Sequence, residues 1–239
     1  MGYKYIAFVG SYSQPGQADP FESSHGGIPH DRSRVGKGVL AIGVDAEGKL
    51  SYLNNGDPVI RADDLPNPSY LSFNGRSGEA ARLCVVSELV DGRWQEFSVE
   101  FEEHNGEDVK LEPTDDLVDT EGSYPCHIIH ASPLLGTDLI FISNYGEDQG
   151  VFSIFSNNNL NHKVLFGDGS RANFTRQQTS HAHSSCISPA MISSDVLGVC
   201  VADLGSDSII QLGLTPNNLE CVEIGRLAAP AGSGPRSRE

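Results

Sequence analysis

An all-β fold is predicted, because short apolar runs recur along the whole chain and no helical pattern does. The runs are rich in Val, Ile and Phe, and Gly, Asn, Asp and Pro separate them. This composition is typical of strands joined by hairpin turns. No segment shows sustained apolar residues at a 3.6-residue period. The runs also repeat at a nearly constant interval, which reduces the number of all-β folds that fit the sequence.

The repeat becomes visible when four stretches are aligned: "NPSYLSFN", "YPCHIIHASP", "HAHSSCISP" and "GPRS". Pro68, Pro125, Ala182 and Pro235 take the same place in them, at successive intervals of 57, 57 and 53 residues. Further β-rich runs follow each of the first three stretches, such as "RLCVVSEL", "DLIFISNYG" and "VLGVCVADLG". Several strands in each long repeat predict a β-propeller, whereas a β-sandwich would not explain the equal intervals.

The first repeat unit consists of "KYIAFVGSY" and "GVLAIGVDAEGKL". Residues 13–37 between them are rich in Gly, Pro and Ser, which predicts a long loop within a hairpin. The later strands are expected at about 67–74, 83–88, 124–131, 138–143, 151–155, 183–188, 196–202 and 208–213. Residues 1–239 are therefore expected to form one partial propeller domain of about four blades.

The charge and cysteine content exclude several classes of function. A net charge of −16 argues against binding to nucleic acid or to anionic membrane surfaces, because both carry negative phosphate. No apolar run approaches the length of a membrane span. Five cysteines without paired spacing are typical of reduced thiols, so a cytoplasmic location is expected. The oligomeric state is left open.

The repeat brings distant residues to equivalent positions. Ser69, Cys126, His183 and Arg236 occupy the same place in successive repeats, and His127 lies one residue further along. In a propeller, the starts of the innermost strands converge at one mouth of the central channel. We therefore expect His183 and Arg236 to share one pocket, the usual place for a ligand site.

The aligned repeat stretches, together with "ISNYG", "RQQTSHAHSSCISP" and "PAGSGPR", resemble the seven-bladed lactonase propellers. That family includes bacterial-type 6-phosphogluconolactonases and fungal carboxymuconate cyclases. The resemblance extends from "FVGSY" near residue 8 to Arg236. It implies that His183, the second histidine of an "HxHS" stretch, and Arg236, the arginine of "GPR", belong to the active site.

The chain departs from the family pattern in three places. The family's site glutamate, in an "NE" pair after "GPR", has no counterpart before Glu239; Glu88 in "SEL" is the substitute that the sequence offers. The histidines of "SHAH" lack the prolines that often precede them. The loop at 13–37 is longer than the family's first hairpin.

Lactone opening explains why these residue types would be needed. A base must take a proton from the attacking water, and a donor must stabilise the oxyanion that forms. His183 suits the first task, and Arg236 suits the second or binds a substrate phosphate. Glu88 is the third catalytic candidate. Four further residues are candidates for substrate binding: His127, His181, Arg171 and Arg176.

The predicted function is hydrolysis of a sugar lactone without a cofactor. The resemblance points to 6-phospho-D-glucono-1,5-lactone, a phosphorylated small molecule of the pentose phosphate pathway, with 6-phosphogluconate as product. Two alternatives stay open: a carboxymuconate-type lactonising isomerase, and a propeller that binds a partner without catalysis.

Structural explanations exist for the same residues. His181 and His183 could be an ordinary pair on one strand face, and Glu88 a turn residue. Arg171 and Arg176 could be solvated loop charges. A zinc site would need a third ligand such as His127, and no HxxxH motif or cysteine pair supports it, so no metal is expected.

The number of repeats also leads to a prediction about the stability of the chain. About four repeats fall short of the seven that the resemblance implies, and the last residues, "GSGPRSRE", contain no strand. Unclosed propellers leave sheet faces exposed. We therefore expect a truncated product that is marginally stable and weakly active or inactive.

Overall fold

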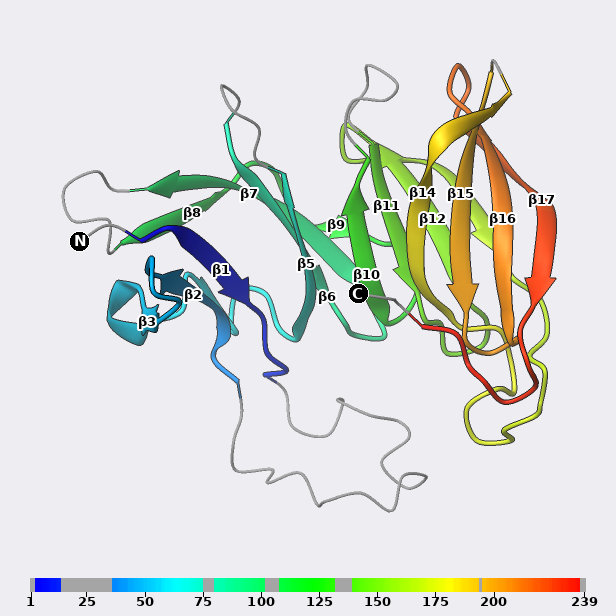
Figure 1. Cartoon of the computed structure of the whole chain (residues 1–239), viewed down its shortest axis with the longest axis horizontal. Helices are drawn as coiled ribbons and strands as arrows, with labels where there is room; N and C mark the ends of the chain where they lie inside the picture. The colour runs from blue at the N-terminus through cyan, green and yellow to red at the C-terminus, as the bar shows by residue number, and fades with distance from the viewer. Residues whose placement is uncertain are drawn as a thin grey trace. The chain divides into compact units, whose positions relative to one another are not determined.

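The computed structural model describes residues 3–13, 36–74, 80–101, 108–131, 139–193 and 195–236 (Figure 1). The chain divides into two compact units, Met1–Glu88 with Trp94–Leu117, and Leu89–Arg93 with Val118–Glu239. The described residues are almost entirely in strands and turns, as the sequence predicts. None of their helices is long and apolar enough to cross a membrane.

The first unit is built on two antiparallel sheets. One contains β1 (Tyr5–Val9), β2 (Gly38–Val44), β3 (Leu50–Tyr52) and β4 (Ile60–Arg61), with the short helix η1 (Asn54–Gly56) after β3. The other contains β5 (Pro68–Asn74), β6 (Arg82–Ser87), β7 (Arg93–Phe101) and β8 (Val109–Pro113). The two-residue strand β9 (Val118–Asp119) belongs to the second unit. Most of the predicted loop at 13–37 lies outside the described residues.

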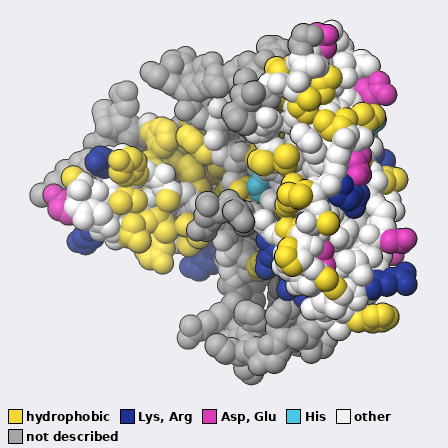
Figure 2. All heavy atoms as spheres, turned by 45° about the vertical axis from the view of Figure 1, so that its right-hand side comes forward, with side chains coloured by type: hydrophobic (Ala, Val, Ile, Leu, Met, Phe, Trp, Pro, Cys, Tyr) yellow, Lys and Arg dark blue, Asp and Glu magenta, His cyan; other side chains and the backbone are white. Residues whose placement is uncertain are grey.

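Side chains from both sheets, among them Val39, Leu83 and Val85, form the core of the first unit together with Leu65 from the connection between β4 and β5. Apolar side chains also gather on its surface, in the left-hand part of Figure 2. They line a hollow of about 490 Å³, formed by Tyr3, Lys4, Tyr5, Ile6, Phe8, Leu71, Phe73, Leu83 and Phe101.

The second unit contains two four-stranded antiparallel meanders. The first runs through β10 (Pro125–His130), β11 (Leu139–Asn144), β12 (Val151–Ser156) and β13 (Asn159–Leu165). The second runs through β14 (Ala182–Ser193), β15 (Val196–Asp203), β16 (Ser208–Thr215) and β17 (Glu220–Ala228). First strand contacts first strand (β10 with β14) and last contacts last (β13 with β17), as in neighbouring propeller blades (Figure 1).

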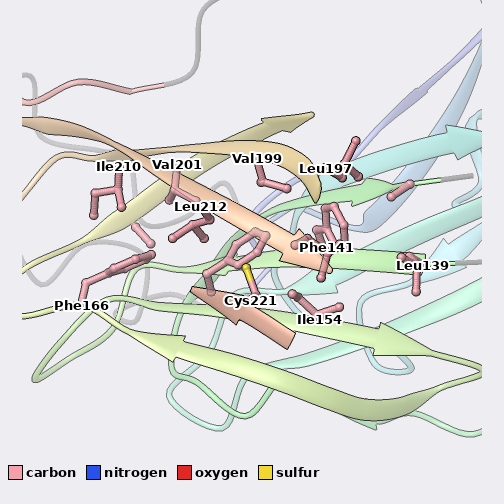
Figure 3. Close-up of a cluster of buried hydrophobic side chains, with 14 residues drawn as sticks. Leu139, Phe141, Ile154, Phe166, Leu197, Val199, Val201, Ile210, Leu212 and Cys221 are labelled. Atoms are coloured by element: carbon pink, nitrogen blue, oxygen red, sulfur yellow. The ribbon is translucent and has the colours of Figure 1, made fainter. Parts of the chain in front are cut away.

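Apolar side chains from the two sheets interlock between them (Figure 3). Phe141 from β11 lies against Phe152 from β12, with ring centroids 5.5 Å apart, and Val199, Val201 and Leu212 pack from the other sheet. Complete burial of such a side chain contributes about 1.5–3 kcal/mol. This core holds together the two strands, β10 and β14, whose starts carry the candidate site residues.

Candidate active site

A β-bulge places the repeat-equivalent residues. The strands β5, β10 and β14 begin at Pro68, Pro125 and Ala182, the residues that the repeat alignment matched. In each strand the second residue is extra: Ser69, Cys126 and His183 fall where the pairing register shifts. Bulges bend a strand and redirect a side chain, and they are frequent beside active sites. His183 therefore has a local structural reason to leave the sheet pattern.

The second unit brings three repeat-equivalent residues together. The Cys126 Sγ lies 3.4 Å from the carbonyl oxygens of Ala182 and His183. Arg236 Nε donates a hydrogen bond to His183 Nε2 at 3.0 Å. Cys126, His183 and Arg236 thus follow one another as equivalent positions of neighbouring blades would. Ser69 belongs to the first unit.

His183 is held as a neutral imidazole. Burial, followed by the nearby charge of Arg236, lowers the pKa of His183 from 6.5 to about 4. Because Nε2 accepts the bond from Arg236, the ring proton is on Nδ1. Arg236 is exposed, and its terminal guanidinium nitrogens make no hydrogen bond within the described part of the chain.

His127 is buried close enough to His183 to influence its ionisation. Its Nδ1 accepts a hydrogen bond from the backbone N–H of Ser185 on β14 at 3.4 Å, so the proton resides on Nε2. Burial lowers the pKa of His127 to about 4. The two histidines therefore present opposite tautomers, one with Nε2 as acceptor and one with Nε2 as donor.

His181 is fixed in place by packing and hydrogen bonds. Its ring stacks on Tyr145 at 4.0 Å with an interplanar angle of 11°, and its Nδ1 lies 3.0 Å from the Tyr145 carbonyl oxygen. Its backbone N–H donates to Asp203 Oδ1 at 2.7 Å. Burial lowers the pKa of His181 despite these contacts. His181 thus supports the start of β14 and the Tyr145 ring.

The two loop arginines are placed differently. The charge of Arg176 contributes to lowering the pKa of both His181 and His183, so it lies near the histidines. Arg171 is exposed, and its backbone N–H donates to the Gln177 carbonyl oxygen at 2.9 Å. No described contact connects the Arg171 side chain with the histidines.

Glu88 belongs to the first unit. Its Oε2 accepts a hydrogen bond from the Tyr12 hydroxyl at 2.7 Å, and its backbone N–H donates to the Asn67 carbonyl oxygen. The second unit therefore assembles His127, His181, His183, Arg176 and Arg236. Among the described residues, no group of three His, Cys, Asp or Glu side chains could hold a metal ion.

Tyr145 is a candidate site residue that the sequence reasoning missed. Its ring stands edge-on to His183, with centroids 6.2 Å apart and an interplanar angle of 84°. Its backbone N–H donates to the Tyr124 carbonyl oxygen, as Glu88 donates to Asn67 in the previous repeat. Aligning "VSEL" with "SNYG", which lies 57 residues later, could have identified Tyr145 as the equivalent of Glu88.

Asp207 is the second missed residue, and it holds the segment that carries Arg236. Its Oδ1 accepts hydrogen bonds from Gly234 N at 2.7 Å and Gln177 Nε2 at 2.6 Å. Its Oδ2 accepts from Gly232 N and Ser170 Oγ, both at 2.7 Å. Burial alone would raise the pKa of Asp207, but these four bonds outweigh it and lower the pKa. We call this arrangement the Asp207 latch.

Replacing Asp207 by asparagine should loosen the Asp207 latch. The Asn amide nitrogen cannot accept a hydrogen bond, so the buried Gln177 amide or the partly buried backbone N–H groups lose their partner, at a cost of about 1–3 kcal/mol. The segment that carries Arg236 should then move from His183, and the pKa of His183 should rise because a nearby positive charge is lost. NMR titration of the histidine rings measures this shift. An unchanged His183 pKa in a folded Asp207→Asn protein would show that the latch does not place Arg236.

The two low histidine pKa values predict a loss of stability in acid. The folded values of about 4 for His127 and His183 lie below 6.5, so the unfolded chain binds more protons between these limits. The free energy of unfolding should therefore fall as the pH drops from 7 to 5, by roughly 2 kcal/mol for each histidine. Urea unfolding at both pH values checks this. His183→Gln should reduce the pH dependence, and an unaltered slope would contradict the assignment.

A family model described as "Lactonase, 7-bladed beta-propeller" matches residues 7–238. A candidate 6-phosphogluconolactonase structure from Bacteroides fragilis NCTC 9343 has a TM-score of 0.60 at 20% identity, covering 97% of this chain and 56% of that one. A Lactobacillus plantarum protein structure has a TM-score of 0.63 at 18% identity, covering 97% and 55%. No curated protein matches the chain significantly.

The two solved structures share their fold with this chain, which spans just over half of their length. The family model covers nearly all of the chain, including both histidines of "SHAH" and Arg236. Together with the four antiparallel sheets, this match shows that the chain belongs to the lactonase family of seven-bladed β-propellers.

Proposed function

We propose that the site around His183 and Arg236 hydrolyses a sugar lactone, with 6-phospho-D-glucono-1,5-lactone as the substrate. The observation that carries the proposal is the 3.0 Å contact between a neutral imidazole and a guanidinium whose terminal nitrogens are uncommitted within the described residues. The contact brings together a group that can accept a proton and a hydrogen-bond donor that can stabilise negative charge. Membership of the lactonase family supports the assignment.

The chemistry follows from the protonation states. Nε2 of His183 carries a lone pair and takes a proton from water as the water oxygen attacks the lactone carbonyl carbon. Negative charge then develops on the carbonyl oxygen, and the Nε–H of Arg236, released from His183 when the terminal guanidinium nitrogens bind the phosphate, stabilises it. When the bond between the carbonyl carbon and the ring oxygen breaks, the His183 imidazolium returns the proton to the leaving oxygen. The product is an open-chain hydroxy acid.

In the described structure Arg236 occupies the lone pair that the base needs. An anionic substrate group that binds the guanidinium draws Arg236 from His183 and exposes Nε2. The departure of the Arg236 cation and the arrival of the substrate anion both favour the charged imidazole. The pKa of His183 therefore rises toward neutrality. A substrate phosphate would in this way prepare the base for its reaction.

The charge distribution favours a phosphorylated substrate. The whole chain has a net charge of −16, yet Arg176 and Arg236 both act on His183. Arginine binds phosphate through two parallel hydrogen bonds, which suits an anion that must enter an acidic protein. A neutral gluconolactone would lack this interaction and would leave Arg236 on His183.

A spectrophotometric assay with two lactones tests the proposal. Freshly prepared 6-phosphoglucono-1,5-lactone and glucono-1,5-lactone are compared after spontaneous hydrolysis is subtracted. We expect a higher kcat/KM for the phosphorylated lactone. Equal values for both lactones would refute the role given to the phosphate. Turnover of a carboxylated muconolactone alone would instead assign the site to the lactonising isomerase reaction.

A further inference from the structure

Two cysteines lie opposite each other across the β14–β15 ladder. Cys186 on β14 and Cys200 on β15 are direct partners in the antiparallel register. They are 14 residues apart in sequence, a spacing that gives no recognisable motif. Figure 3 shows Val199 and Val201 in the core between the sheets, so strand alternation puts Cys200 on the other face. Cys186 is on that same face, and it is exposed.

The geometry of this pair suits a covalent bond. Direct partners in an antiparallel ladder have Cα atoms about 4.5–5.5 Å apart, within the roughly 4.4–6.8 Å that a disulfide spans. The Cys186 side chain raises the pKa of the Cys200 thiol, which agrees with the proximity that the register gives the two side chains. Both are free thiols in the structure.

The other three cysteines have different surroundings. Cys84 and Cys221 are buried, and burial raises the pKa of Cys221 to about 12. Cys126 is directed at three backbone carbonyl oxygens. Cys221 pairs in register with Leu214, not with a second cysteine. The pair on β14 and β15 is thus set apart by both position and exposure.

We propose that Cys186 and Cys200 form a dithiol–disulfide site, at which a hydroperoxide converts the two thiols into one cross-strand disulfide. Cys186, the exposed partner, attacks the peroxide first. The O–O bond breaks, Cys186 becomes a sulfenic acid, and one molecule of water or alcohol leaves. The Cys200 sulfur then attacks the Cys186 sulfur, the S–O bond breaks, and water leaves. The two thiols lose two electrons and two protons in total, and the peroxide is reduced.

The order of attack follows from the surroundings of the two thiols. Burial, and then the proximity and hydrogen bond of Cys186, raise the pKa of the Cys200 thiol. Cys200 is therefore the less readily ionised thiol, whereas Cys186 is exposed to the solvent and to peroxide. This arrangement is that of an attacking cysteine with a neighbouring resolving cysteine.

The bridge would act on the strand that carries His183. Cys186 lies three residues after His183, in the short regular stretch of β14 between the bulge at His183 and the irregular pairing after Ile187. The register shifts on both sides of this stretch. A disulfide to β15 would fix the stretch in its present pairing. The modification therefore lies next to the candidate site and is independent of the substrate assigned to it.

Peptide mapping of the purified chain tests the inference. The reduced chain is treated with stoichiometric hydrogen peroxide, free thiols are alkylated, and the unreduced digest is analysed by mass spectrometry. We expect one major cross-linked peptide pair, Cys186 with Cys200, lighter by two hydrogen atoms and reversible by dithiothreitol. Cys186→Ser and Cys200→Ser should abolish it, and Cys126→Ser should retain it.

A second measurement keeps the test independent of the folding of the variants. In the wild-type chain, peroxide should remove two titratable thiols while the circular dichroism spectrum stays unchanged. In urea, where the sheet is lost, cross-links should distribute among several cysteines. Sulfinic acid at Cys186 with a reduced Cys200, or predominantly intermolecular disulfides, would overturn the proposal.

Discussion

Replacing His183 by glutamine should lower the rate of lactone opening by about 10²–10⁴, the usual contribution of a general base. The glutamine side-chain oxygen can still accept the hydrogen bond from Arg236, so the guanidinium keeps its partner. It cannot take a proton from water. Initial rates at saturating lactone, corrected for spontaneous hydrolysis, measure the loss in kcat.

The melting temperature separates this catalytic role from a structural one. His183 is only partly buried and lies on a bulge, so glutamine should change the melting temperature little at pH 7. His183→Ala, which removes the acceptor for Arg236 as well, is the matched comparison. Activity and stability that fall together in both variants would favour a purely structural histidine.

Replacing Arg236 by glutamine should have an effect of similar size for a different reason. Loss of a donor to a developing oxyanion costs about 2.7–4 kcal/mol, or about 10²–10³ in rate. The pKa of His183 should rise above about 4, although burial, its largest cause, remains. Kinetics and histidine NMR titration measure the two effects on the same protein.

Arg236→Lys is the control for charge without planar geometry. Lysine keeps the positive charge but cannot form two parallel hydrogen bonds with phosphate. We expect KM for the phosphorylated lactone to rise in this variant. If Arg236→Gln left both the rate and the His183 pKa unchanged, Arg236 would have no part in the site.

The strands of the second unit were predictable because their sequence signals are local. Alternating apolar residues between Gly, Asn and Asp turns located β10, β11, β12, β15 and β16 to within two residues. The exception is β14, expected to end at 188 but extending to Ser193. Pro189 led to the expectation of a turn. In the described residues, however, β14 pairs only with β15, so it is an edge strand, and the pairing register shifts near Pro189. Edge strands and bulges tolerate proline.

The proximity of His183 and Arg236 was predictable because both occupy the repeat position. The bulge that redirects His183 was not, since a bulge depends on the pairing with the neighbouring strand. Asp207 gave no signal, because its four partners, two backbone N–H groups and two side chains, lie 25 to 37 residues away in the sequence. The Cys186–Cys200 pair likewise depends on strand register, which a spacing of 14 residues does not reveal.

The most direct test of the account is a parallel set of progress curves for freshly prepared 6-phosphoglucono-1,5-lactone. The wild-type chain, His183→Gln and Arg236→Gln are compared with the spontaneous reaction at equal protein concentration and pH. We expect the wild-type chain to exceed the spontaneous rate and both variants to fall close to it while remaining folded. A wild-type rate no faster than the spontaneous one, or a His183→Gln rate equal to wild type, would contradict it.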